Sequence, residues 1–244
     1  MVGFNILRCG VFEMKIVGID ASINSTGLVS LTLDDNLSVI NVDYLGFTQV
    51  KKLSGPKIVY FKKGDFGNYL DQNLFMQEYV EIFCSGASYV AFEDYAYAAV
   101  GKVFHIAEYT GNLKMSLYHT SASIRLYDPP TIKMFATKKG NADKIRMVDE
   151  YDNSNAPWQN RPDLNFLVDP NRISSKYDSP RSDIVDAYFI VKLLQLELTL
   201  LYSQHGFTIK SIPDKIIQNI FERKTKGNPI PLLNRPFLTI GSKQ

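Results

Sequence analysis

Runs of apolar residues bounded by turn-forming residues divide the first part of the chain into short strands. Each of three segments combines β-branched and other apolar residues, as buried or half-buried strands do: Met14–Asp20, Leu28–Leu33 and Leu37–Phe47. The turn signal Asp34-Asp35-Asn36 separates the last two. Because the connections are short, the three segments predict an antiparallel meander. The polar segment 51–67 then predicts a loop or an insertion.

Further along the chain, apolar positions spaced three and four apart predict helices, and short apolar runs between them predict two more strands. The helices are expected over 71–83, 101–119, 130–135, 142–151 and 183–202, with Ser182 as the N-cap of the last. The strands are Tyr89–Glu93 and Ser123–Tyr127. Three antiparallel strands followed by strands separated by helices predict an α/β fold: a mixed five-stranded sheet flanked by helices.

Length and composition indicate one globular domain with insertions. The chain has 244 residues, of which 45% are hydrophobic and 21% charged, and no apolar run reaches the roughly 18 residues of a membrane helix. Two cysteines exclude a disulfide framework and a cysteine-rich zinc site, so we expect a cytoplasmic protein without a membrane partner. We divide the chain into an N-terminal extension (1–13), a main domain (14–205) with insertions near 51–67 and 153–180, and a basic C-terminal tail (206–244).

The net charge of +2 conceals an uneven distribution. From residue 207 to the end there are seven basic and two acidic residues. A second stretch, from Arg125 to Arg146, has six basic and two acidic residues, among them Lys133, Lys138, Lys139 and Lys144. Two basic segments on a mildly acidic body suit a polyanion that touches part of the surface. Solvated helix faces and a loose tail are the alternative explanation.

Four carboxylates from three remote segments carry the candidate chemistry. Asp20 and Glu93 each end an apolar strand, and Asp183 and Asp186 lie three residues apart on a predicted helix, so both can point the same way. Strand ends that meet at one sheet edge are a common place for a site. Together the four predict a site for two Mg²⁺ ions, which prefer hard oxygen ligands, with one ion activating water and the other stabilising the leaving 3′ oxygen of a phosphodiester. Taken singly, each carboxylate could instead be a turn residue or a first-turn helix acid.

The order of these motifs resembles that of the RuvC family of Holliday-junction resolvases, in particular its bacteriophage-type members. The segment from Gly18 to Gly27, GIDASINSTG, is similar to the family's opening motif G-I-D-x-S-x-x-x-T-G, and Val90-Ala91-Phe92-Glu93 to its second carboxylate strand. Glu108-Tyr109-Thr110-Gly111 resembles the following helix, and the segment from Lys133 to Lys144 the family's lysine-containing region. The segment from Ser182 to Ala187 resembles its closing D-x-x-D-A.

The resemblance implies a ribonuclease H-like fold and a homodimer that nicks opposing strands of a four-way DNA junction. It implies that Asp20, Glu93, Asp183 and Asp186 bind Mg²⁺, with Mn²⁺ as a substitute, and that Lys144 acts at the scissile phosphate. The resemblance also places Lys133 on the DNA backbone, and the basic stretch adds Lys138 and Lys139. Tyr97 is expected to stack on a splayed base, or else to pack in the core. For a phage-encoded chain the place of action is the host cytoplasm.

Several alternatives stay open at this point. A broader branched-DNA nuclease or a ribonuclease H would need the same carboxylates, and substrate preference alone separates them. A DNA-binding scaffold without catalysis is a different class, against which the intact set of four carboxylates argues. The tail could grip DNA arms or drape over a partner subunit.

Overall fold

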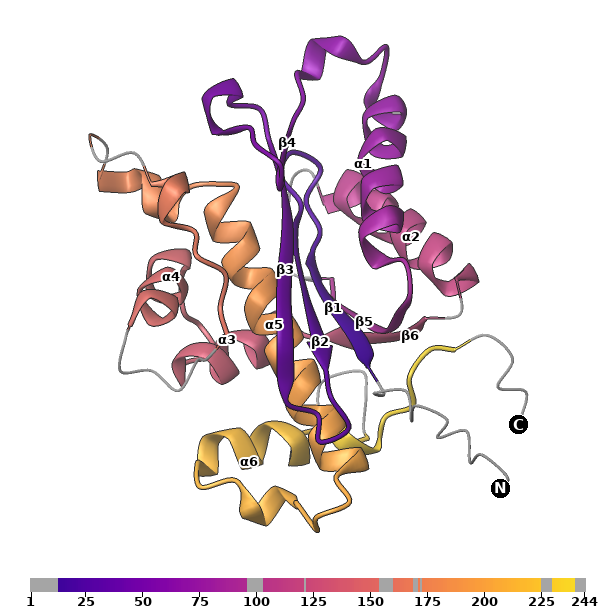
Figure 1. Ribbon diagram of the computed structural model, residues 1–244, viewed down its shortest axis with the longest axis vertical. Helices are drawn as coiled ribbons and strands as arrows, with labels where there is room; N and C mark the ends of the chain where they lie inside the picture. Colours follow the sequence, from indigo (N-terminus) through magenta and orange to yellow (C-terminus); the bar gives the residue numbers. More distant parts are fainter. Residues whose placement is uncertain are drawn as a thin grey trace, which may run out of the picture.

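The computed structural model describes residues 13–95, 103–120, 122–153, 160–168, 171, 173–224 and 230–239. A six-stranded sheet in the order β4-β3-β2-β1-β5-β6 runs through its centre (Figure 1). The strands are β1 (Met14–Asp20), β2 (Gly27–Leu33), β3 (Val39–Thr48), β4 (Ile58–Tyr60), β5 (Ala87–Glu93) and β6 (Ser123–Tyr127). The predicted meander is confirmed, since β1, β2 and β3 pair antiparallel, while β5 pairs parallel with β1 and β6 parallel with β5.

The sheet has one strand more than the five predicted. Strand β4 lies within the segment 51–67 and pairs parallel with the end of β3. Ile58 is buried there, and the Phe61 amide donates to the Thr48 carbonyl at 3.0 Å. The prediction of a loop was wrong for these residues because a three-residue strand between polar flanks has too few positions to show a period.

Helices cover both faces of the sheet, as Figure 1 shows. One face packs against α1 (Tyr69–Cys84) and α2 (Val103–His119), and the other against α3 (Pro129–Thr137), α4 (Lys144–Asp152), α5 (Arg181–Tyr202) and α6 (Lys215–Glu222). Successive side chains of β1 point to opposite faces of the sheet and so contribute to the hydrophobic core on each face. Ile16 packs on the α5 side, and Val17 and Ile19 pack on the side of α1 and α2. The expected mixed α/β sheet flanked by helices is therefore confirmed.

Helix α5 begins two residues earlier than predicted. Its N-cap position is Pro180, which makes no side-chain cap, and Ser182 is a buried residue of the first turn. The prediction of Ser182 as N-cap was therefore wrong. No helix among the described ranges is long and apolar enough to span a bilayer.

The described part of the 206–244 segment packs on the main domain. In α6, Ile220 and Phe221 are buried in the core shared with α3 and α5. Further on, Leu238 forms an antiparallel bridge with Ile124 of the edge strand β6. These contacts cover the edge of the sheet, which would otherwise expose unpaired backbone groups.

Candidate active site

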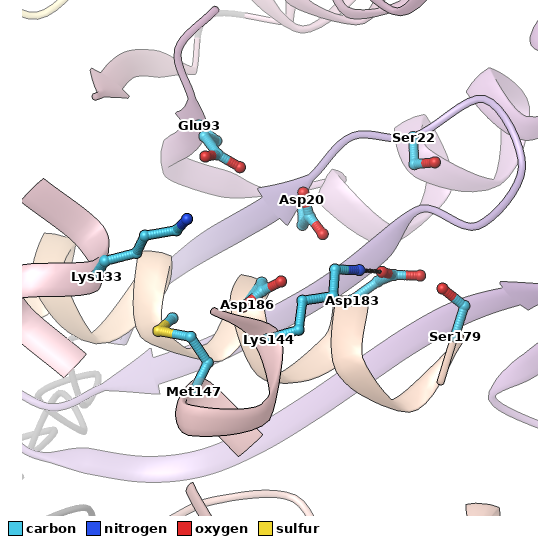
Figure 2. Close-up of a pocket in the computed structure, with 9 residues that line it drawn as sticks. All are labelled: Asp20, Ser22, Glu93, Lys133, Lys144, Met147, Ser179, Asp183 and Asp186. Atoms are coloured by element: carbon cyan, nitrogen blue, oxygen red, sulfur yellow. Dashed lines mark hydrogen bonds and ion pairs between the residues drawn. The ribbon is translucent and has the colours of Figure 1, made fainter. Parts of the chain in front are cut away.

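A polar cavity of about 310 Å³ lies where β1 and β5 end against the start of α5. Figure 2 shows its side chains, which come from five separate parts of the chain. The lining residues are Asp20, Ser22, Glu93, Lys133, Lys144, Met147, Ser179, Asp183 and Asp186. All four predicted carboxylates and two of the predicted lysines therefore lie in one cavity.

The strand register brings the first two carboxylates together. Strands β1 and β5 are parallel, and Ile19 pairs with Phe92, so Asp20 and Glu93 follow at adjacent positions on neighbouring strand ends. Parallel strands carry such residues to the same edge of a sheet. The two short motifs, remote in sequence, thus meet through backbone pairing alone.

Two glycines let α5 lie close enough to the sheet to bring the other two carboxylates in. A Cβ on Gly27 would stand 2.3 Å from the backbone carbonyl oxygen of Asp183, and one on Gly18 would stand 2.4 Å from that of Ala187. No real side chain fits at such distances. The glycines of the opening motif therefore serve close backbone approach, and they set the depth at which Asp183 and Asp186 face Asp20.

Hydrogen bonds of the motif's serine and threonine shape the loop between β1 and β2. The Thr26 hydroxyl donates to the Ser22 carbonyl at 2.8 Å, and the Ser22 amide donates back to the Thr26 hydroxyl oxygen at 3.2 Å. The hydroxyl of fully buried Tyr109, from α2, lies 3.2 Å from the same Thr26 oxygen. The loop is thus fixed by its own residues and by the segment 108–111, and it places Ser22 at the cavity.

The carboxylates repel one another across the cavity. Burial raises the pKa of Asp20 well above its usual range, and the neighbouring charges of Asp186, Asp183 and Glu93 raise it further. Burial raises the pKa of Asp186 to about 7, even though Lys144 acts to lower it. Burial also raises the pKa of Glu93 against the lowering effects of Lys133 and Lys144. More negative charge converges here than the two lysines compensate.

Lys144 supplies the positive charge nearest three of the carboxylates. Its ammonium donates to Asp183 Oδ1 at 2.9 Å and lies 3.4 Å from the Ser182 hydroxyl. Partial burial lowers the pKa of Lys144, but the ion pair with Asp183 and the charges of Asp20 and Asp186 outweigh this effect, so the pKa is raised. Lys144 is therefore protonated at neutral pH.

The donor set fits a hard divalent cation in its chemistry. All four acidic side chains offer carboxylate oxygens, which Mg²⁺ prefers. The Oδ2 atom of Asp183 is buried with no hydrogen-bond partner in the described structure, and an orphaned buried acceptor of this kind is costly unless something binds it. As they stand, no three acidic, histidine or cysteine side chains in the described ranges group closely enough to hold one ion together. Asp183, for its part, is turned toward Lys144.

Other predicted DNA contacts lie away from the cavity. Lys138 forms an ion pair with Asp214, at the start of α6, at 2.8 Å. Lys139 is exposed and lines a second, open cavity of about 590 Å³ along α4. Tyr97 lies outside the described residues.

Ser179 and Met147 line the cavity without having been predicted to do so. Ser179 stands among polar residues of the segment 153–180, which was predicted only as an insertion, so no sequence signal marked it. Met147 faces the cavity one turn after Lys144 on α4, and helical spacing from that lysine could have identified it. Ser22 was part of the opening motif, but no role had been assigned to it.

Comparison with known proteins gave no matching family model and no matching curated protein. Among solved structures, the chain is similar to RuvC of Thermus thermophilus, with 14% identity and a TM-score of 0.43 over 72% of this chain and 92% of that one. It is also similar to Thermus thermophilus RuvC in complex with a Holliday junction substrate, with 14% identity and a TM-score of 0.43 over 78% of this chain and 93% of that one. At this level of similarity, the evidence that bears on function is the set of side chains in the cavity.

Proposed function

We propose that the protein is a divalent-metal-dependent endonuclease that resolves four-way DNA junctions by paired symmetric nicks. The observation that carries the proposal is the convergence of Asp20, Glu93, Asp183 and Asp186 with Lys133 and Lys144 in one cavity. A purely structural cluster would pair these charges, whereas here burial and mutual repulsion leave the carboxylates poorly compensated.

In this proposal the four carboxylates hold Mg²⁺, or Mn²⁺ in its place. Bound divalent ions supply an activated water and stabilisation of the leaving 3′ oxygen in phosphodiester hydrolysis. Lys144, which is protonated and half-exposed, faces the scissile phosphate and offsets the negative charge that develops there. Lys133 binds the neighbouring backbone phosphate from the Glu93 side of the cavity (Figure 2).

Paired nicks require two copies of the chain. The described structure has one carboxylate cavity per chain, and one such cavity cuts one strand. Two symmetric cuts therefore call for a homodimer with a two-fold axis that matches the junction. We also propose that the protein belongs to the bacteriophage-type members of the family and acts in the cytoplasm. For a phage-encoded chain, this is the cytoplasm of the host. The motif order from Asp20 to Asp186 supports the family assignment, and the low cysteine content supports the cytoplasmic setting.

A cleavage panel tests the proposal. An immobile four-way junction labelled on each strand is incubated with the protein and Mg²⁺, beside a linear duplex, a fork and an RNA–DNA hybrid. We expect paired nicks at symmetric positions of the junction alone. Cutting of forks as well would assign a broader debranching nuclease, and cutting of the hybrid alone would assign a ribonuclease H. Metal-independent binding without any cutting would contradict the proposal and favour a DNA-binding scaffold.

A further inference from the structure

The strongest unexplained feature beside the cavity is a fully buried arginine at the first position of α5. Arg181 is 2% exposed, and its guanidinium Nε has no hydrogen-bond partner in the described structure. Burying a guanidinium carries a large desolvation cost before its partners are counted, and an apolar side chain of similar length would avoid that cost. Its unpartnered Nε sets Arg181 apart from a buried arginine whose donors are all satisfied.

The partners of Arg181 tie α5 to the far end of α4. Its Nη2 donates to Asp152 Oδ1 at 2.5 Å, and its Nη1 donates to the Lys176 carbonyl at 2.9 Å. Asp152 is the last residue of α4, whereas Lys144, which pairs with Asp183, is the first. Helix α4 is thus held against the first turn of α5 at both of its ends.

Further contacts at the surface reinforce the packing of α4 against the start of α5. The Lys176 ammonium lies 2.7 Å from Asp149 Oδ1, and the Tyr177 hydroxyl donates to the same oxygen at 3.0 Å. Both carboxylates, Asp149 and Asp152, belong to the second half of α4, and their donors belong to the segment before α5 and to the first residue of α5. The contacts between Lys176 or Tyr177 and Asp149 are exposed and weak individually, so the buried Arg181 bond dominates.

We propose that Arg181 is a positioning residue: by holding Asp152 at the end of α4, it fixes how that helix approaches α5 and so keeps Lys144 on Asp183. The importance of this contact for strand cleavage rests on the proposed nuclease function. Arg181 is absent from the cavity lining and acts through α4 alone.

Hydrogen exchange tests whether Arg181 holds α4 against α5, and it does so without reference to catalysis. Arg181→Met should accelerate exchange of the α4 backbone amides by roughly tenfold, because a bond that restrains local opening is lost. Lys57→Met is the matched control, since it breaks an exposed ion pair with Asp43 that joins β3 to the residue before β4 and should leave those amides unchanged. Should Arg181→Met fail to fold, Asp152→Ala removes the same bond from its more exposed side, and Arg181→Lys should restore part of the protection. Unchanged α4 exchange in a folded variant would overturn the proposal.

Single-turnover cleavage of the four-way junction tests whether Arg181 supports strand cleavage by positioning Lys144. Arg181→Met should slow cutting by about 10²-fold, the order expected when a reacting group is misplaced by about 1 Å, with junction affinity unchanged. In a Lys144→Met background the same substitution should add no further loss, because Arg181 acts only through Lys144. Additive losses would overturn the proposal. A wild-type protein that cuts no DNA would contradict the nuclease function, and α4 exchange would still support or overturn the restraint by Arg181.

Discussion

Two clusters of buried charge lie at opposite ends of α5, and they handle that charge in opposite ways. At one end Glu197, fully buried, accepts from Arg125 at 2.6 and 3.1 Å and from the Tyr127 hydroxyl at 2.6 Å. Arg125 also donates to the carbonyls of Arg235 and Pro236 and lies 3.8 Å from the ring centroid of Phe237. At the other end the carboxylates of the cavity face one another, and one buried oxygen of Asp183 has no partner.

The difference indicates which cluster serves the fold and which serves a ligand. The Arg125–Glu197 cluster satisfies its own charges, and its partners in 235–237 hold the C-terminal segment against the sheet edge. The cavity concentrates negative charge that protons or an external cation must balance. Buried polar groups that are fully satisfied rigidify a structure, and those left unsatisfied point to function.

The largest expected effect is the loss of cleavage in Asp186→Asn. Removing one metal ligand should lower the rate on a four-way junction by at least about 10³-fold, because metal catalysis contributes several kcal/mol of transition-state stabilisation. Junction binding should persist, since Lys133 and Lys144 remain. Gel-shift and single-turnover assays measure both quantities, and a variant that folds but no longer binds the junction would argue against this assignment of the site.

Glu197→Gln is expected to lower stability and to leave cleavage unchanged, the opposite of Asp186→Asn. It leaves the buried Arg125 charge without its partner, so the free energy of unfolding should fall by about 3–5 kcal/mol. Cleavage per folded molecule should be unchanged, because Glu197 is far from the cavity. Urea denaturation measures the loss, and the double variant Arg125→Met/Glu197→Leu, which removes both charges, should recover much of it. Equal losses in the single and double variants would show that the charge itself is unimportant there.

Gly27→Ala tests the close approach that brings α5 to the sheet. The added methyl group would meet the Asp183 backbone at 2.3 Å, so α5 must shift, at a cost of about 1–3 kcal/mol for overpacking. Because Asp183 and Asp186 move with the helix, metal affinity should also fall. Gly55→Ala is the matched control, since a Cβ there meets nothing within 4 Å. Equal stability and equal metal affinity of the two variants would contradict this role for Gly27.

The raised pKa values predict an unusual pH dependence of stability without metal. Asp186 titrates near pH 7 in the folded protein, against an ordinary value of 3.8, so between these values the folded state binds more protons than the unfolded state. The free energy of unfolding should therefore fall as pH rises through that window, and Asp20 and Glu93 act in the same direction. Thermal melts in EDTA at pH 5.5 and pH 8 measure the difference, and Asp186→Asn should reduce it. A melting temperature that rises across the window would contradict the account.

The smallest expected effect concerns the basic C-terminal segment. Deleting everything after Gly206 would also remove buried Phe221 and uncover Arg125, so it would confound binding with stability. Replacing exposed Lys210, Lys215 and Lys224 with Gln leaves the packing intact. Each lysine that contacts a phosphate should lower the slope of log affinity against log salt by about 1. An unchanged slope would exclude this segment from the DNA interface.

The strands and the carboxylates were predictable from the sequence because short-range signals mark them. Met14–Asp20 and Ser123–Tyr127 have the predicted bounds, since apolar runs end there on an acid or a turn. What could not be predicted depends on tertiary contact. Arg181 has no distinctive neighbours in sequence, and its bond to Asp152 spans 29 positions. Likewise, the basic residues in 206–244 left open whether this segment is loose, grips DNA or drapes over a partner subunit, whereas Ile212, Ile220, Phe221 and Leu232 pack in the core.

A calorimetric titration of Mn²⁺ into the protein at pH 7.5, with Asp186→Asn and Glu197→Gln titrated beside it, tests the central claim most directly. The account predicts that the wild-type protein and Glu197→Gln bind the ion in the same way, that proton release accompanies binding, and that Asp186→Asn loses most of the affinity. Failure of the wild-type protein to bind Mn²⁺, or equal binding by Asp186→Asn, would contradict the claim that the uncompensated carboxylates form a cation site.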